Sequence, residues 1–224
     1  GDDIVKARNG ADTVNGGDGN DRLLGGDGDD TVNGGDGDDK LFGGSGSDNM
    51  SGGDGNDIYA VDDVNDEVSE EGTTGTDTIF STVTFTAPDN VENLKLRGSG
   101  DIDATGNSLA NRLVGNSGDN TLSGGGEADI LKGRGGDDTL YGGDGNDKLF
   151  GGSGQDIFQL NNDAGRDWIS DYTPGVDSLQ LLGGMEENEL SFKERNGHTK
   201  ITWDNTDDLL AIVANTGAAD LTFI

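Results

Sequence analysis

The feature that most constrains how this chain can fold is a nine-residue repeat. From Gly16 the units GGDGNDRLL, GGDGDDTVN, GGDGDDKLF, GGSGSDNMS and GGDGNDIYA follow in one register to Ala60, and ARNGADTVN precedes them. A second series runs from Gly106 to Gln159 and contains GGDGNDKLF and GGSGQDIFQ. A register kept over so many units predicts a solenoid of stacked coils. It argues against a flexible Gly/Asp linker, which needs no register, and against collagen, which needs a period of three and abundant proline.

Each unit carries one apolar residue at a fixed place. Counted from the first Gly of GGDGNDRLL, position 8 is apolar in almost every unit. These residues are Val5, Val14, Leu23, Val32, Leu41, Met50, Tyr59, Leu113, Leu122, Leu131, Leu140, Leu149 and Phe158. One inward side chain flanked by two outward ones predicts a strand of about three residues. Two units would close one flattened coil, so that unit n stacks on unit n + 2.

Glycine and aspartate fill most of the remaining positions. Gly at positions 1, 2 and 4 predicts a turn with positive φ angles that brings backbone carbonyls together. Position 6 is aspartate at Asp3, Asp12, Asp21, Asp30, Asp39, Asp48, Asp57, Asp129, Asp138, Asp147 and Asp156. Stacking would place these carboxylates in two files, about 4.8 Å apart along each file. A hard dication between coils would turn their repulsion into attraction, and Ca²⁺ suits mixed carboxylate and carbonyl ligands better than Mg²⁺ does.

The composition shows why such a cation is needed. The chain has 224 residues, of which 42 are Gly and 29% are hydrophobic, and a formal net charge of −31. This balance predicts disorder unless something other than apolar burial stabilises the fold. So acidic a chain disfavours nucleic acid and anionic membranes as partners. No apolar run approaches the roughly 18 residues that would span a bilayer, and the lack of cysteine excludes disulfides and thiolate metal sites.

The repeat resembles that of the RTX (repeats-in-toxin, hemolysin-type) family of secreted calcium-binding proteins, and KLFGGSG at Lys40–Gly46 recurs at Lys148–Gly154. The resemblance implies an all-β fold, a right-handed parallel β-roll or β-helix (solenoid), which we expect to end in a small antiparallel β cap. It also implies that the position 6 aspartates of two stacked coils and the carbonyls of the glycine turn surround each ion. On this basis the predicted backbone ligands are Gly10, Gly17, Gly19, Gly26, Gly28, Gly35, Gly37, Gly44, Gly46, Gly53, Gly55, Gly136, Gly143, Gly145, Gly152 and Gly154. We expect about five calcium ions in the first array and about two to three in the second.

The second array departs from the motif in places that matter for calcium. Asn111 and Asn120 replace aspartate at position 6, Leu109 and Glu127 replace glycine at position 4, and Arg134 replaces glycine at position 2. These two asparagines remove negative charge from the first coils of the second array. The ion-binding pairs that we predict there are Asp129–Asp147 and Asp138–Asp156.

The regions outside the arrays carry other strand signals. DTIFSTVTFT at 77–86 alternates with period two and VENLKL at 91–96 reads as a further strand, so we expect the spacer to extend the solenoid without calcium; a separate β insertion is the alternative. In the tail, Asn196-Gly197 between two alternating runs predicts a hairpin, and 207–215 predicts one more strand. We therefore divide the chain into a first RTX array at 1–60, a calcium-poor spacer at 61–105, a second array at 106–160 and a C-terminal β cap at 161–224.

Nothing in the sequence indicates catalysis. The single His198 adjoins a predicted turn, which favours a solvated surface side chain, and no zinc-protease motif or nucleophile elbow occurs. In the family that the repeat resembles, enzymes carry their catalytic residues upstream of the repeats. The first residues of this chain, GDDIV, fall in the middle of a repeat unit. We therefore expect no catalytic residue here and a longer chain that continues upstream.

Two functions fit these observations. The first is a calcium-binding module that folds outside the cell, which would make the protein secreted, extracellular or attached to the cell surface. It would support type I secretion and the folding of an upstream domain, and ADLTFI at the end of the chain reads either as an uncleaved export signal or as a last strand of the cap. The second is a polysaccharide-binding or adhesion solenoid, like the repeat modules of alginate epimerases. Its candidate basic residues are Lys95, Arg97, Arg112, Lys193, Arg195 and Lys200.

Overall fold

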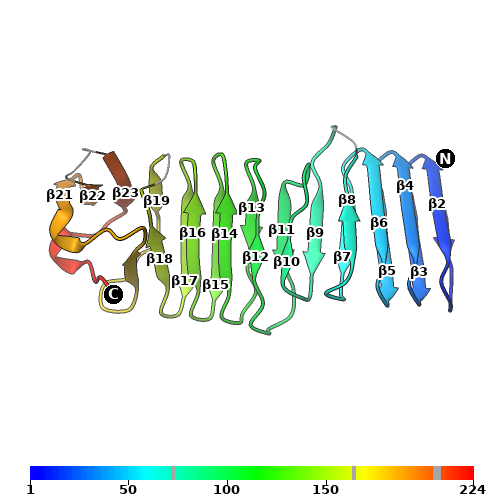
Figure 1. Ribbon diagram of the computed structural model, residues 1–224, viewed down its shortest axis with the longest axis horizontal. Helices are drawn as coiled ribbons and strands as arrows, with labels where there is room; N and C mark the ends of the chain where they lie inside the picture. Colours follow the sequence, from blue (N-terminus) through cyan, green and yellow to red (C-terminus); the bar gives the residue numbers. More distant parts are fainter. Residues whose placement is uncertain (72–73, 163–164, 204–207) are drawn as a thin grey trace. The chain divides into compact units, whose positions relative to one another are not determined.

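The computed structural model describes residues 1–71, 74–162, 165–203 and 208–224, without the Asp208 side chain. The chain forms two compact units, Gly1–Arg97 and Gly98–Ile224, which Figure 1 shows in blue to green and in green to red. The described residues are nearly all strand or turn. Two short 3-10 helices, η1 (Glu187–Glu189) and η2 (Ala218–Asp220), are the helical elements among them, and neither has the length or apolar character of a membrane-crossing helix.

The first unit is a parallel β-solenoid with two sheets. One sheet contains, in spatial order, β1 (Ile4–Lys6), β3 (Arg22–Asp27), β5 (Lys40–Ser45), β7 (Ile58–Val61), β9 (Thr78–Ser81) and β11 (Asn93–Leu96); the other contains β2 (Thr13–Asp18), β4 (Thr31–Asp36), β6 (Asn49–Asp54) and β8 (Glu67–Ser69). Successive strands alternate between the sheets because each coil contributes one strand to each (Figure 1). Val14 lies opposite Val32 and Leu23 opposite Leu41, so the predicted coil of two units is confirmed.

The second unit repeats this construction and adds a cap. Its solenoid sheets are β13 (Arg112–Val114), β15 (Ile130–Gly135), β17 (Lys148–Ser153) and β19 (Asp167–Ile169), and β12 (Ala104–Thr105), β14 (Thr121–Gly125), β16 (Thr139–Gly143), β18 (Ile157–Leu160) and β20 (Ser178–Leu181). Strand β23 (Asp208–Val213) lies parallel to β19, and β22 (His198–Trp203) and β21 (Leu190–Arg195) complete an antiparallel meander. The predicted hairpin is confirmed, with φ angles of 55° at Asn196 and 79° at Gly197. Strand β23 accounts for most of the predicted 207–215 strand, of which residue 207 lies outside the described residues.

The core is a column of position 8 side chains. All of those predicted are buried, from Val14 to Phe158, with the exception of the half-buried Val5 in the first coil. Each buried Leu or Met contributes about 1.5–3 kcal/mol, but each nine-residue unit supplies a single one. A core so thin leaves much of the stability to the turns.

The array strands are longer than predicted. Most of them have six residues, as in Thr31–Asp36, instead of about three. The ladder continues through the glycine pair of the next unit, because Gly17 lies opposite Gly35 and Asp18 opposite Asp36. Glycine has no side chain and therefore fits into this closely stacked ladder. The strands can thus continue through the glycine pair, which the expected three-residue strand did not include.

The spacer within the first unit continues both sheets. Strands β7, β9 and β11 pair in parallel, as do β6 and β8. The predicted 77–86 strand is interrupted after Ser81, because the Ser81 hydroxyl donates to the Val83 carbonyl (2.7 Å) and accepts from the Val83 N–H (3.1 Å). A short strand, β10 (Phe85–Thr86), follows.

Candidate metal centre

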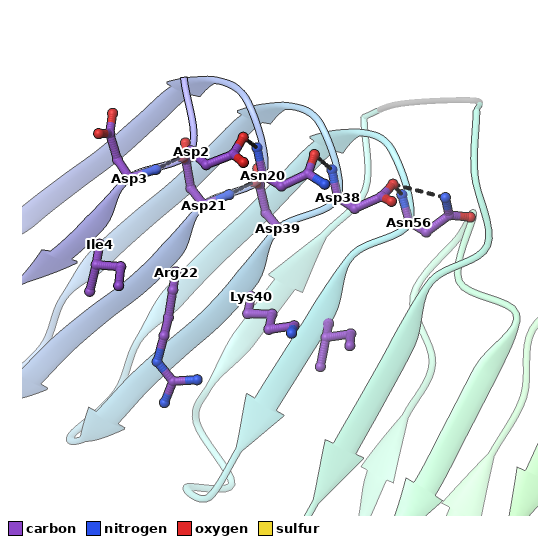
Figure 2. Close-up of a pocket in the computed structure, with 11 residues that line it drawn as sticks. Asp2, Asp3, Ile4, Asn20, Asp21, Arg22, Asp38, Asp39, Lys40 and Asn56 are labelled. Carbon is purple, nitrogen blue, oxygen red and sulfur yellow. Dashed lines mark hydrogen bonds between the residues drawn. The ribbon is translucent and has the colours of Figure 1, made fainter.

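The position 6 aspartates stack in two files, as predicted. In one file the Asp3 N–H donates to Asp21 Oδ1 (2.6 Å), the Asp21 N–H to Asp39 Oδ1 (2.7 Å) and the Asp39 N–H to Asp57 Oδ1 (2.7 Å). Figure 2 shows Asp3, Asp21 and Asp39 following one another in this way. The same bond links Asp12 to Asp30, Asp30 to Asp48, Asp129 to Asp147 and Asp138 to Asp156. One carboxylate oxygen of each linked aspartate therefore holds the previous coil.

The other carboxylate oxygen has no partner. In the described part of the chain, the Oδ2 atom is buried without a hydrogen bond in Asp21, Asp30, Asp39, Asp48, Asp57, Asp129, Asp138, Asp147 and Asp156. These side chains are between 0% and 2% exposed. A buried carboxylate that lacks a partner is costly by several kcal/mol, so it must take a proton or a cation.

Glycine at position 1 gives this oxygen its surroundings. A Cβ on Gly34 would collide with Asp39 Oδ2 and with the carbonyl oxygen of Gly52 in the next coil. The position 1 glycines of the other units with a position 6 aspartate also lie against the aspartate Oδ2, and Gly16, Gly25, Gly124 and Gly133 lie against a next-coil carbonyl as well. We expected these glycines to supply positive φ angles, and that is wrong: Gly34 is not among the positive-φ residues. Glycine is needed there because the backbone must approach the carboxylate. Carboxylate and carbonyl oxygens side by side are the donor set of a calcium site, so the residues present fit that ion.

Glycines at positions 2 and 4 do adopt positive φ, with the exception of Gly118. Every glycine predicted as a backbone ligand has φ between 95° and 139°. Arg134 and Glu127, which replace glycine in the second array, keep the turn with φ angles of 86° and 65°. Leu109 does not keep this turn conformation, and its N–H donates instead to Asn107 Oδ1 (2.8 Å).

Burial makes the charged form of these aspartates unfavourable without a cation. Burial raises the pKa of Asp57, Asp129 and Asp138 to about 7, and backbone N–H donors offset part of this effect. It raises the pKa of Asp156 to about 6. The pKa values of Asp39, Asp48 and Asp147 shift upward for the same reason.

The first two predicted ligands differ from the others. Asp3 is exposed and Asp12 is half-buried, because no preceding coil covers them in the first unit. Their backbone N–H groups belong to the two files. Their carboxylates lack the enclosure that marks the other nine.

The asparagines that open the second array are satisfied within the protein. Asn120 Oδ1 accepts the N–H of Asn116 (2.9 Å), and Asn120 Nδ2 donates to the Ile102 carbonyl (2.6 Å) and to Asn116 Oδ1 (3.1 Å). Asn111 Oδ1 likewise accepts the Asn107 N–H (2.6 Å). An amide supplies its own donor, so these coils close through hydrogen bonds.

Two features of the turns escaped the sequence analysis. Asp66 is a position 6 aspartate without a glycine turn, and its Oδ2 accepts the N–H groups of Asp62 (3.0 Å) and Asp63 (3.1 Å). A second, outer file also links the coils at position 5. Figure 2 shows this file beside an open pocket, and its members are Asp2, Asn20, Asp38 and Asn56. The recurrence of Asp or Asn at position 5 of the repeat could have predicted this outer file.

The residues considered for other functions have structural contacts. His198 is half-buried, accepts the Asn215 N–H at Nδ1 (3.0 Å) and packs edge-on against Trp168. Lys95 and Arg97 lie over the Phe80 ring. The other candidate basic residues are Arg112 on β13 and Lys193, Arg195 and Lys200 on the β21–β22 hairpin.

Glycine turns joined by short parallel strands, with buried files of aspartate, define a calcium-binding β-solenoid. The family model described as the RTX calcium-binding nonapeptide repeat matches in four copies, at residues 1–32, 24–59, 105–135 and 123–158. These matches cover just over half of the chain, and the chain belongs to this family.

The other comparisons add the following. No curated protein matches the sequence. Among solved structures, the crystal structure of extracellular lipase LipA from Serratia marcescens is similar, with 19% sequence identity and a TM-score of 0.37. The alignment covers 94% of this chain and 39% of the lipase chain.

Proposed function

We propose that this chain is a calcium-dependent folding module of a protein exported by type I secretion. At the low calcium concentration of the cytosol its carboxylates repel one another and keep it unfolded. Outside the cell, sites with Kd values of about 10⁻⁴–10⁻³ M fill, and the binding free energy becomes folding free energy. The folded module then stabilises a domain that precedes it in the same polypeptide.

One observation carries this proposal: among the residues that the structure describes, nine aspartate Oδ2 atoms are buried without a hydrogen bond. Asp21 to Asp57 and the glycine carbonyls would hold about five ions in the first array, and Asp129 to Asp156 would hold those of the second. The role of the residues is to present paired oxygens at a fixed spacing and to exclude water around them. The ion would supply the positive charge that the sequence, with 14 basic against 45 acidic residues, lacks.

Circular dichroism tests the proposal. In a chelator we expect a coil spectrum, and in about 5 mM Ca²⁺ a β spectrum, with the transition in the range of extracellular sites. The same concentration of Mg²⁺ is the control and should leave the coil spectrum unchanged. A chain that keeps its β spectrum in the chelator at neutral pH contradicts the proposal.

Polysaccharide binding stays a prediction that needs its own measurement. Retention on an alginate column at low salt, in calcium, would support it. The substitutions Lys193→Gln and Lys200→Gln should then abolish retention, since these two residues lie opposite each other on the hairpin.

A further inference from the structure

Three buried carboxylates converge where the first array ends. Asp57, Glu70 and Asp77 are 0%, 7% and 3% exposed, and each offers an oxygen that lies within 4.8 Å of the other two. Asp57 belongs to the repeat, whereas Glu70 and Asp77 lie in the spacer. Neither of these two residues was predicted as a ligand, because both fall outside the glycine-turn units.

The oxygens of this cluster lack partners. Asp57 Oδ2, both carboxylate oxygens of Glu70 and the Tyr59 hydroxyl are buried without a hydrogen bond. The N–H groups of Gly52 and Gly53 lie near enough to favour the charged form of Glu70, but neither makes a hydrogen bond of normal geometry. A Cβ on Gly52 would collide with three oxygens at once, those of Tyr59, Asp57 and Glu70. The oxygens of these three side chains therefore converge beside Gly52.

The register explains why a glutamate is found here. Ser51 lies opposite Ser69, so Glu70 occupies the place one coil beyond Gly52 where the array coils carry position 1 glycine. The unit that begins at Glu70 therefore lacks the position 1 glycine of the array units. The Glu70 side chain enters that space, and Asp77 Oδ1 accepts the Asp57 N–H (2.7 Å) from the far side.

The end of the second array provides an internal comparison. Asp156, Asp171 and Asp177 take the places of Asp57, Glu70 and Asp77. Asp171 is one methylene shorter, and it accepts the N–H groups of Gly151 (3.0 Å) and Gly152 (3.1 Å). Asp177 accepts the Thr173 N–H (2.7 Å). At the second end, Asp171 and Asp177 thus accept hydrogen bonds while Asp156 Oδ2 has none, whereas at the first end neither carboxylate oxygen of Glu70 has a partner.

We propose that Asp57, Glu70 and Asp77 form a closing site for a hard cation of the calcium class. Its donor set is three side-chain carboxylates, whereas each array site is built from aspartate and backbone carbonyls. Because affinity for Ca²⁺ rises with the number of charged ligands, this site fills at a lower calcium concentration than the array sites. The proposal rests on the calcium chemistry proposed for the arrays, but it concerns residues outside the repeat.

Ion counting by native mass spectrometry and calorimetry tests the site. In the whole chain, Glu70→Gln should bind one calcium ion fewer than the wild type and lose the tightest phase of the titration, at least a tenfold weakening. Glu71→Gln is the matched control, since Glu71 is the exposed neighbour, and it should keep both. If Glu70→Gln keeps the wild-type count and the tightest phase, Glu70 is only a cap for the Gly52 and Gly53 N–H groups and the proposal is wrong.

Two further measurements cover a variant that fails to fold. Asp77→Asn keeps an oxygen for the Asp57 N–H and should also lose the tightest phase. In the wild type, the first equivalent of Tb³⁺ should show emission sensitised by Tyr59, which Tyr59→Phe removes; a first equivalent without this emission overturns the site. A wild-type chain that binds no calcium at all would instead contradict the proposed function.

Discussion

The glycine-turn coils of the first array and the coils that open the second array close in different ways. From Asp21 to Asp57, one carboxylate oxygen holds the previous coil and the other is buried without a partner. At Asn111 and Asn120, the amide oxygen accepts a hydrogen bond from its own turn. The same backbone stack is thus completed by hydrogen bonds at the two asparagines, whereas each of these aspartates leaves one buried oxygen that a cation could complete.

Asp66 shows that the turn matters as much as the side chain. It is an aspartate in the same file, yet the N–H groups of Asp62 and Asp63 reach its Oδ2. The unit from 61 to 69 has no glycine, so its backbone folds back towards the carboxylate. At Gly34, by contrast, the glycine turn brings Asp39 Oδ2 close to the carbonyl oxygen of Gly52. We therefore expect a calcium site to need both the position 6 aspartate and the glycines.

The largest effect that sharpens this comparison should come from position 1. Gly34→Ala places a Cβ against Asp39 Oδ2 and the Gly52 carbonyl, which should lower the free energy of unfolding in calcium by about 3 kcal/mol. Gly126→Ala is the matched control, since its Cβ would meet nothing nearer than 3.7 Å. Denaturant titration in calcium measures both. Equal effects would contradict the account of position 1.

Exchanging the two side chains of the comparison should have the next largest effect. Asn120→Asp removes hydrogen bonds to the Ile102 carbonyl and to Asn116 Oδ1, at about 1 kcal/mol each, and added calcium should not restore them. Asp39→Asn should cost about 2 kcal/mol in calcium and nothing in chelator. Recovery of Asn120→Asp by calcium would show that the glycine turn is not required.

A change of pH should have a smaller effect than these substitutions, a shift of about tenfold in the calcium concentration at the midpoint of folding. Burial places the pKa of Asp57, Asp129 and Asp138 at about 7, above the unfolded value of about 3.9. Without metal, the stability these groups contribute is present below about pH 4 and is lost as the pH rises through 7. Protons compete with calcium, so the midpoint should rise about tenfold between pH 8 and pH 6. A midpoint independent of pH would contradict the burial of these groups.

The smallest effect should come from replacing a non-glycine residue that has a positive φ angle. Arg134→Gly relieves a φ of 86° and should stabilise the second unit by about 1 kcal/mol. Asn196→Gly is the control, because asparagine tolerates its φ of 55° and should give almost no gain. Thermal unfolding in calcium measures both. If Arg134→Gly is less stable than the wild type, the Arg134 side chain makes a contact that stabilises the protein by more than its backbone strain costs.

The repeat sufficed to predict the coil, the core and the aspartate files. Position 8 gave the buried column and the period gave the register, because both follow from local spacing. Position 1 glycine was misread, since its reason is a contact with the next coil and not a local φ angle. Glu70 was missed because it stands, 18 residues after Gly52, where the array units carry glycine. Asp77 was missed because the spacing changes from 18 to 20 residues between Asp57 and Asp77. Partners brought together by an insertion cannot be read from a fixed period.

The central claim is that each orphaned Oδ2 atom is a calcium ligand, and a crystal structure grown in calcium tests it most directly. Anomalous scattering should place an ion about 2.3–2.6 Å from Oδ2 of Asp21, Asp30, Asp39, Asp48 and Asp57. No ion should lie beside Asn111, Asn120 or Asp66. Calcium beside these three, or none beside the five aspartates, would contradict the account.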